Sequence, residues 1–320
     1  MDAVLLLLVV AYLMAIIYAA NQVEIGEWTF NTLQPMLYGL VGVVALLAFV
    51  TFVGLGLPLP QLNGDAPIDR LDPLALVLSL LLVVACVAGA ALVTRSEAAR
   101  YRVPSFISEP SIYRPNSPVH LAAVVLSLML VCSQALTFLS GGGLAGVAQD
   151  VAISGLSVFE LLLNMVLWVS AAFLGVGYLL RRDLSQALTR LGLRAPTRGD
   201  VLGGVAVGLG LFGMSIAFSI LWQAFAPPEQ FAEQNQAAQQ IAMSIDRFAL
   251  VLAVSLSAAI GEEIFIRGAL QPVFGVALSS AFFAVLHSQY LFAPSMLFIF
   301  AVSVGLGLLR RHTSTTAAII

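Results

Sequence analysis

The sequence predicts an all-α protein, a polytopic transmembrane helix bundle with about nine complete spans and the start of a tenth. Apolar residues make up 60% of the 320 residues, and charged residues only 10%. This charge is too sparse to cover the surface of a water-soluble domain of this length. Runs of roughly 18 or more apolar residues recur along the whole chain, which is the pattern of membrane-spanning helices.

Hydropathy windows of roughly 19 residues place the individual spans. They are Val4–Ala20, Met36–Leu57, Pro73–Val93, Val119–Leu139, Phe159–Leu180, Val201–Phe225, Phe248–Leu270, Val273–Tyr290 and Pro294–Leu309. The connections between them carry the Pro, Asn, Asp and Arg residues typical of loops. The longest, Thr94–Pro118, is expected to be partly ordered on the membrane surface. Thr313–Ile320 resembles the first turns of a tenth span, so we expect the sequence to be a fragment.

The arginine distribution predicts the orientation of these spans. One set of alternate loops holds eleven arginines and the opposite set only Arg70 and Arg247. The positive-inside rule then places the N-terminus outside, in a plasma membrane. Because all 14 basic residues are Arg, we expect a bacterial source with a GC-rich genome. The net charge of −3 and the absence of a basic run exclude nucleic acid as a partner.

Three ionisable residues, Glu262, Glu263 and Arg267, fall inside the seventh predicted span. Each ionised group costs roughly 2.5–3.5 kcal/mol in the centre of a membrane helix, so such groups usually have a role. Glu263 and Arg267 are spaced i, i+4 and can form an ion pair on one helix face. Glu262 points elsewhere and is a candidate general base. The alternative is a structural pair that joins helices, with Glu262 at a wet interface.

The eighth span contains Phe283 and His287, which are also spaced i, i+4. A neutral imidazole at this position can bind a water, polarise a carbonyl or stabilise an oxyanion. The alternative is a histidine hydrogen-bonded to a backbone carbonyl. Of the weaker candidates, Glu160 and Asn164 share a face of the fifth span, and Glu160 is expected to reach the membrane surface. His120 is expected at the membrane interface. Several serines show no base partner: Ser279, Ser280 and Ser295.

Glu262, Glu263 and Arg267 in one span, followed by Phe283 and His287 in the next, resemble the motifs of the CPBP family of CAAX proteases and bacteriocin-processing membrane proteins. The similarity covers residues 181–320, and residues 1–180 are N-terminal spans of unassigned role. The resemblance implies an intramembrane endopeptidase of the glutamic type. Its substrate would be a peptide bond of a membrane-associated protein, such as a prenylated C-terminus in eukaryotes.

The resemblance also implies a role for each motif residue. Glu262 would activate water, and His287 would bind that water or the oxyanion. Glu263 and Arg267 would hold the site together, with Phe283 as a further orienting residue. No cofactor follows from these residues, and a divalent metal such as zinc on Glu262 and His287 is left open.

Two features depart from the family pattern. The family's third motif, a histidine followed four residues later by Asn or Asp, is not supplied by His312 and Thr316. The link between the first two motifs is also short. In straight spans Glu262 would lie ~12 Å deep and His287 ~21 Å deep. We therefore expect a turn within the membrane between Gln271-Pro272 and Gly275.

Two other functions compete with a protease. A noncatalytic membrane scaffold, or a bacteriocin-immunity-type protein of the same fold, would use the spans to bind a partner. A transporter would use Glu262 as a proton relay, and the lack of an internal repeat makes it the weakest of the three hypotheses.

Overall fold

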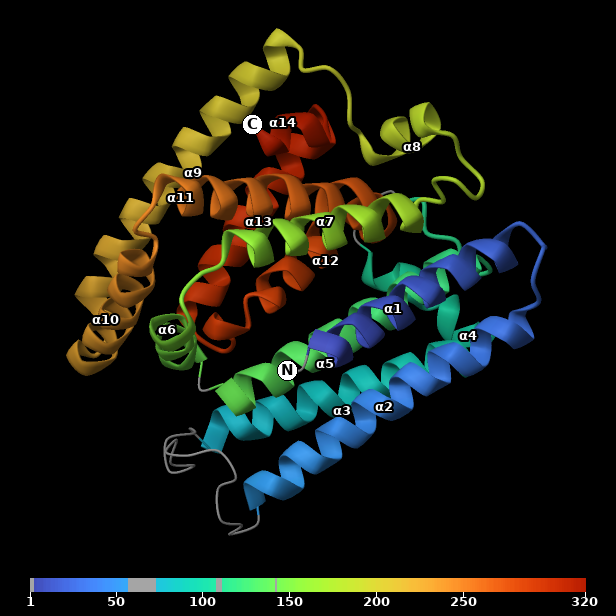
Figure 1. Cartoon of the computed structure of the whole chain (residues 1–320), viewed down its shortest axis with the longest axis horizontal. Helices are drawn as coiled ribbons and strands as arrows, with labels where there is room; N and C mark the ends of the chain where they lie inside the picture. The colour runs from blue at the N-terminus through green and yellow to red at the C-terminus, as the bar shows by residue number, and fades with distance from the viewer. Residues whose placement is uncertain (1–2, 57–72, 108–110, 142) are drawn as a thin grey trace.

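The computed structural model describes residues 3–56, 73–107, 111–141 and 143–320 (Figure 1). These residues fold into helices and contain no strands, which confirms the all-α prediction. Two parts of the sequence-based prediction, Leu57 at the end of the second span and Arg70 in the following loop, lie outside the described residues.

Eight helical runs in the described residues are long and apolar enough to cross a membrane. Six of them are single α-helices between Ala3 and Phe225. These are α1 (Ala3–Glu24), α2 (Phe30–Gly56), α3 (Pro73–Arg95), α5 (Pro118–Gly141), α7 (Val158–Gly175) and α9 (Arg198–Phe225). The fifth predicted span ends earlier than expected, at Gly175, because Gly177 and Leu179 have positive φ and turn the chain.

The seventh and eighth predicted spans lie in the 39-residue stretch Phe248–Leu286. This stretch is one of the eight runs, but non-helical backbone at Gly275 divides it into two helices. The run consists of α11 (Phe248–Leu256), η3 (Ser257–Glu262), η4 (Ile264–Leu270) and α12 (Gln271–Leu286). Gly275 interrupts the helix inside α12 with φ 76° and ψ 176°. This break lies at the end of the segment from Gln271 to Gly275 in which the turn was predicted. The last long helix is α13 (Pro294–His312).

Short helices occupy several segments that the hydropathy windows left as loops. They are α4 (Glu97–Arg100), η2 (Val103–Phe106), α6 (Gly143–Ser154), α8 (Leu184–Leu191) and α10 (Pro228–Ser244). Two more short helices are η5 (Ser288–Tyr290), at the end of the predicted eighth span, and α14 (Thr315–Ile319), in the predicted start of a tenth. The two in the longest connection confirm its expected partial order. α10 is largely polar, and a hydropathy scan does not detect such a helix.

The beginning of α14 is fixed by side chains from two earlier segments. The Ser314 hydroxyl caps the helix by accepting from the Ala317 amide and donates to Asp200 Oδ1 at 2.8 Å. The Thr315 hydroxyl donates to the Leu191 carbonyl at 2.6 Å. A helix therefore begins where the sequence predicted a further helical segment.

Helices α1, α2, α3 and α5 lie side by side and pack on one another, and α7 and α11 cross above them (Figure 1). α12 contacts α5, α13 and η4, while α7 packs against both η3 and η4. The segment with the ionisable residues thus packs against α7 and α12, and α12 in turn packs against α5 and α13. These contacts join helices from both halves of the sequence around one site.

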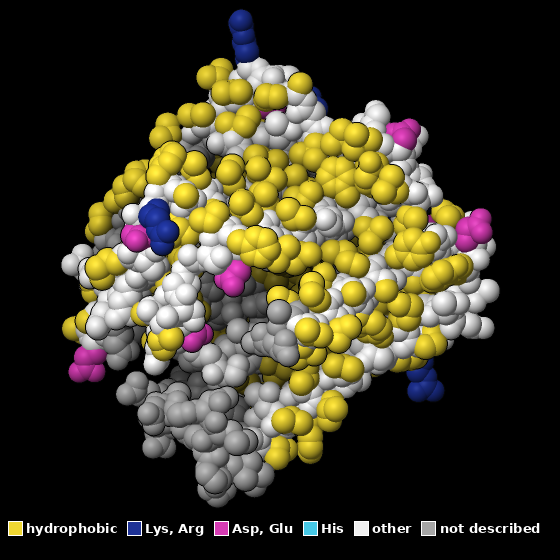
Figure 2. Space-filling model, in the orientation of Figure 1, with side chains coloured by type: hydrophobic (Ala, Val, Ile, Leu, Met, Phe, Trp, Pro, Cys, Tyr) yellow, Lys and Arg dark blue, Asp and Glu magenta, His cyan; other side chains and the backbone are white. Residues whose placement is uncertain are grey.

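The outer surface of the long helices is apolar. Large hydrophobic side chains in these helices are exposed, such as Phe49, Leu81 and Phe212. Figure 2 shows hydrophobic side chains spread over one face of the molecule, with charged side chains sparse and mostly near its edges. An apolar surface of this extent requires lipid around it. The protein is therefore a multi-pass membrane protein.

Candidate functional site

The candidate site is built on a widened part of the Phe248–Leu286 run. Two π-helical segments, η3 and η4, meet at Glu263. Such segments are rare and occur frequently at functional sites. Gly261 in η3 lies so close to α7 that an added Cβ would be 3.1 Å from Met165 Cα. A glycine here therefore lets α7 approach the segment that carries Glu262.

Arg267 is the centre of a buried polar cluster. Its Nε donates to Glu263 Oε2 at 3.1 Å, and its Nη2 donates to Ser303 Oγ of α13 at 3.0 Å. The guanidinium also lies over the Phe283 ring, 5.2 Å from its centroid. The exposed fractions of Arg267 and Glu263 are only 0% and 4%. The predicted ion pair is confirmed, and the other contacts of Arg267 link η4 to α12 and α13.

His287 ends α12 with one ring nitrogen already engaged. Its Nδ1 lies 3.0 Å from the Phe283 carbonyl oxygen, and the rings of the two residues are 4.7 Å apart. A carbonyl oxygen only accepts hydrogen bonds, so Nδ1 carries the proton in this contact. In the neutral ring, Nε2 is then left with its lone pair. The histidine–carbonyl contact, weighed above as an alternative role, thus occupies one nitrogen and leaves the other for chemistry.

Glu262 and His287 line the same pocket, which has a volume of ≈ 320 Å³. Its remaining wall comes from α5, α7, η4, α12 and η5. These residues are Gln134, Asn164, Trp168, Phe265, Ile266, Phe283, Leu286 and Gln289. The break at Gly275 thus accompanies the meeting of two side chains that straight spans would have placed at different depths.

Several residues of this pocket were missed by the sequence analysis. Gln134 and Gln289 were not singled out, and Asn164 was considered only together with Glu160. Asn164 lines the pocket, whereas Glu160 is exposed and does not. Asn164 could have been recognised from the sequence alone, because it is a polar residue within a largely apolar stretch of α7.

The weaker candidates lie elsewhere. His120 Nδ1 accepts a hydrogen bond from the Arg114 amide at the start of α5. The Ser279 hydroxyl donates to the backbone carbonyls of Gly275 and Val276. None of these residues, nor Ser280 or Ser295, lines the pocket of Glu262.

The residues of the pocket do not fit a catalytic zinc site. Such sites commonly have three protein ligands. In the described ranges no group of three or more His, Cys, Asp or Glu side chains is placed to hold a metal. Glu263 is engaged by Arg267, and Glu262 and His287 are the carboxylate and the imidazole that line the pocket.

Comparison with known families gives one match. Residues 244–320 match the family described as Type II CAAX prenyl endopeptidase Rce1-like. This segment, under half of the 320-residue chain, is similar to members of that family. The matched segment begins at the last residue of α10 and contains both motifs of the candidate site. Neither the comparison with curated proteins nor the comparison with solved structures gave a match.

Proposed function

We propose that the protein is an intramembrane endopeptidase that hydrolyses a peptide bond of a membrane-associated protein, with Glu262 as the general base. One observation carries the proposal. Glu262 and His287 line one pocket, while the neighbouring Glu263 is held by Arg267. Glu262 has no hydrogen bond to another described residue, so its carboxylate is available to a water molecule. The CAAX protease match supports a proteolytic reaction.

In this mechanism a water molecule lies between Glu262 and His287. Glu262 takes a proton from the water, and the neutral His287 ring accepts the second O–H in a hydrogen bond at Nε2. The water oxygen attacks the carbonyl carbon of the peptide bond. Glu262 then returns its proton to the leaving nitrogen as the C–N bond breaks, which gives a carboxylic acid and an amine.

The developing oxyanion needs donors on the opposite side of the pocket. The side-chain amides of Gln134 and Asn164 reach the pocket from α5 and α7. Neither amide donates to another described residue, so both have N–H groups to offer. We assign the oxyanion-binding role to these amides. His287 is less suited to it, because its neutral ring donates at Nδ1 to Phe283.

The matched family is described as a CAAX prenyl endopeptidase. For this chain we propose a lipid-anchored or membrane-embedded protein as the substrate. We further propose an N-terminus outside a bacterial plasma membrane, because of the arginine distribution. The arginine-rich loops, including Arg181, Arg182 and Arg190, would then face the cytoplasm.

The proposal is tested by cleavage of membrane-anchored peptides, prenylated and unmodified, by the purified protein in H₂¹⁸O. Expected is one ¹⁸O atom in the new carboxylate of the product after a single turnover. Glu262→Gln should lower the rate by about 10²–10⁴-fold. Glu160→Gln is the matched control, since Glu160 is exposed and outside the pocket, and it should cleave at the wild-type rate. Equal rates for the two variants would refute the proposal.

The same variants separate a protease from a noncatalytic scaffold. A scaffold would bind a membrane partner equally well before and after Glu262→Gln and would release no peptide. A protease with this substitution should still bind the peptide but accumulate it uncleaved.

A further inference from the structure

A second and larger cavity adjoins the candidate catalytic pocket. Its volume is ≈ 730 Å³, within the roughly 300–1,000 Å³ of typical ligand pockets. The two cavities share the side chains of Gln134, Asn164, Trp168 and Phe265. The rings of Trp168 and Phe265 are 4.6 Å apart and form part of the common wall.

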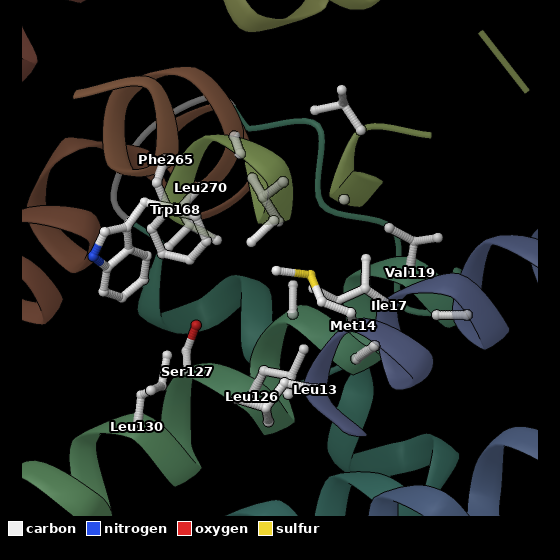
Figure 3. A pocket seen from close by; sticks show the side chains of 18 of the residues that line it. Leu13, Met14, Ile17, Val119, Leu126, Ser127, Leu130, Trp168, Phe265 and Leu270 are labelled. Atoms are coloured by element: carbon white, nitrogen blue, oxygen red, sulfur yellow. The ribbon is translucent and has the colours of Figure 1, made fainter. Parts of the chain in front are cut away.

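The middle of the large cavity is apolar. Figure 3 shows side chains from α1, α5, α7 and η4 around it, with Trp168 and Phe265 at one end and Ile17 and Val119 at the other. The wall from Val119 to Gln134 follows α5 over about 22 Å at 1.5 Å per residue. One acyl chain covers roughly 15 Å, half of the ~30 Å hydrocarbon core. The cavity is therefore long enough for such a chain.

The end away from Trp168 is strongly positive. Among the lining residues are four arginines and one glutamate, namely Arg114, Arg181, Arg182, Arg190 and Glu24. Arg181 and Arg182 follow the end of α7, and Arg190 lies in α8, so the charges are at the ends of the spans. The head groups of lipids lie at this level of a membrane.

These arginines are incompletely neutralised by the protein. Arg181 Nη1 is 3.8 Å from Glu24 Oε1, and Arg181 Nε is buried without a hydrogen-bond partner among the described residues. Arg190 and Arg182 each donate to a backbone carbonyl, of Gly268 and Val176 respectively. Burial, and then the positive charges of Arg182, Arg310 and Arg181, lower the pKa of Arg190 to about 10. A further anion at this end would therefore be stabilised.

The cavity also reaches the outer surface of the bundle. Leu6 and Val9 of α1 line it and are 41% and 43% exposed. Both residues belong to an apolar span, so this opening faces hydrocarbon. A lipid chain can enter from the bilayer without crossing water.

We propose that the large cavity binds one acyl chain of an anionic phospholipid of the bilayer, with the head-group phosphate against Arg181, Arg182 and Arg190. The chain end then lies against Trp168 and Phe265, which also line the pocket of Glu262. Bound lipid thus forms part of the wall of the candidate catalytic pocket. The lipid site shares Gln134 and Asn164 with the candidate catalytic pocket, but lipid binding does not depend on the proposed activity.

Tryptophan fluorescence in detergent provides the test. The chain has three tryptophans, so Trp28→Phe/Trp222→Phe leaves Trp168 as the reporter. Phospholipids with brominated acyl chains and either an anionic phosphatidylglycerol or a zwitterionic phosphatidylcholine head group are titrated into the protein. Expected is saturable quenching of Trp168 by the anionic lipid at lower concentration than by the zwitterionic lipid.

Two sets of variants assign the site. Arg181→Gln/Arg182→Gln should lower the affinity for the anionic lipid by about 30-fold. The exposed pair Arg198→Gln/Arg247→Gln is the control and should leave this affinity unchanged.

Ser127→Phe places a ring in the cavity and should abolish the quenching of Trp168. Val84→Phe, at an exposed position of α3, is its control and should leave the quenching unchanged. Equal affinity for both head groups, or unchanged affinity in Arg181→Gln/Arg182→Gln, would overturn the proposal. Either result would mean that the cavity binds an apolar chain, for example that of a substrate, without recognising a phosphate.

Discussion

Arg267 is joined to Glu263 by a 3.1 Å contact inside the bundle, and this contact distinguishes the two adjacent carboxylates. Glu263 is paired and almost fully buried, whereas Glu262 faces a pocket with His287. Two neighbouring residues of the same type therefore have different environments. We assign a positioning role to Glu263 and the proton-transfer role to Glu262.

The buried pair should be important for stability. Removing one partner leaves an uncompensated charge, which typically costs about 3–5 kcal/mol. We expect Arg267→Met to lower the thermal unfolding temperature in detergent much more than Arg247→Met does. Arg247 forms an exposed pair with Asp246, and such pairs contribute roughly 0–1 kcal/mol. Comparable unfolding temperatures for the two variants would show that the Glu263 carboxylate, left without Arg267, has another partner or a wetter environment.

The double variant Glu263→Leu/Arg267→Met provides a second check on the pair. It removes both charges, so it should be more stable than Arg267→Met alone. If the second substitution lowers the stability of Arg267→Met further, the two side chains do not compensate each other.

Gly275 is expected to be essential for the geometry of the site. Its φ of 76° and ψ of 176° belong to a region that other residues avoid. Gly275→Ala should cost about 1–3 kcal/mol and reduce cleavage, because a helix straightened here moves His287 relative to Glu262. Gly213→Ala is the control, since an added Cβ there meets no atom within 4 Å and the residue is helical. It should be neutral or stabilising by up to about 1 kcal/mol.

Because Nδ1 of His287 carries the proton, two substitutions of this residue should differ in their effect on kcat. His287→Gln places a side-chain oxygen near the position of Nε2, while His287→Asn places its amide near Nδ1. Because the acceptor at Nε2 is the proposed water-binding group, kcat should fall by roughly 10²-fold or more in His287→Asn and by less in His287→Gln. Steady-state kinetics on the same peptide measures both variants. A higher kcat for His287→Asn would assign the reactive role to Nδ1.

Much of the fold was predictable because hydrophobic spans have a strong sequence signal. The Glu263–Arg267 pair also followed from spacing, and the break at Gly275 followed from the depth mismatch between Glu262 and His287. The helix α10 was not predicted, since a polar helix gives no hydropathy signal.

The pocket was only partly predictable for a different reason. Gln134 and Asn164 come from spans far from the motifs in sequence, and their approach to Glu262 depends on how α5 and α7 pack. The π-helical turns also depend on tertiary contacts, such as the close approach of Met165 to Gly261. Hydropathy and spacing within one span contain no information about such contacts.

The shared pocket of Glu262 and His287 is tested most directly by cross-linking. In a Cys86→Ala/Cys132→Ala background, Glu262→Cys/His287→Cys is treated with a short thiol-reactive cross-linker and mapped by mass spectrometry. A control pair, Leu209→Cys/His287→Cys, has one partner on the exposed face of α9. Expected is an intramolecular cross-link between positions 262 and 287 and none in the control. No cross-link at 262 and 287, with both thiols reactive toward a single-ended reagent, would contradict the common site.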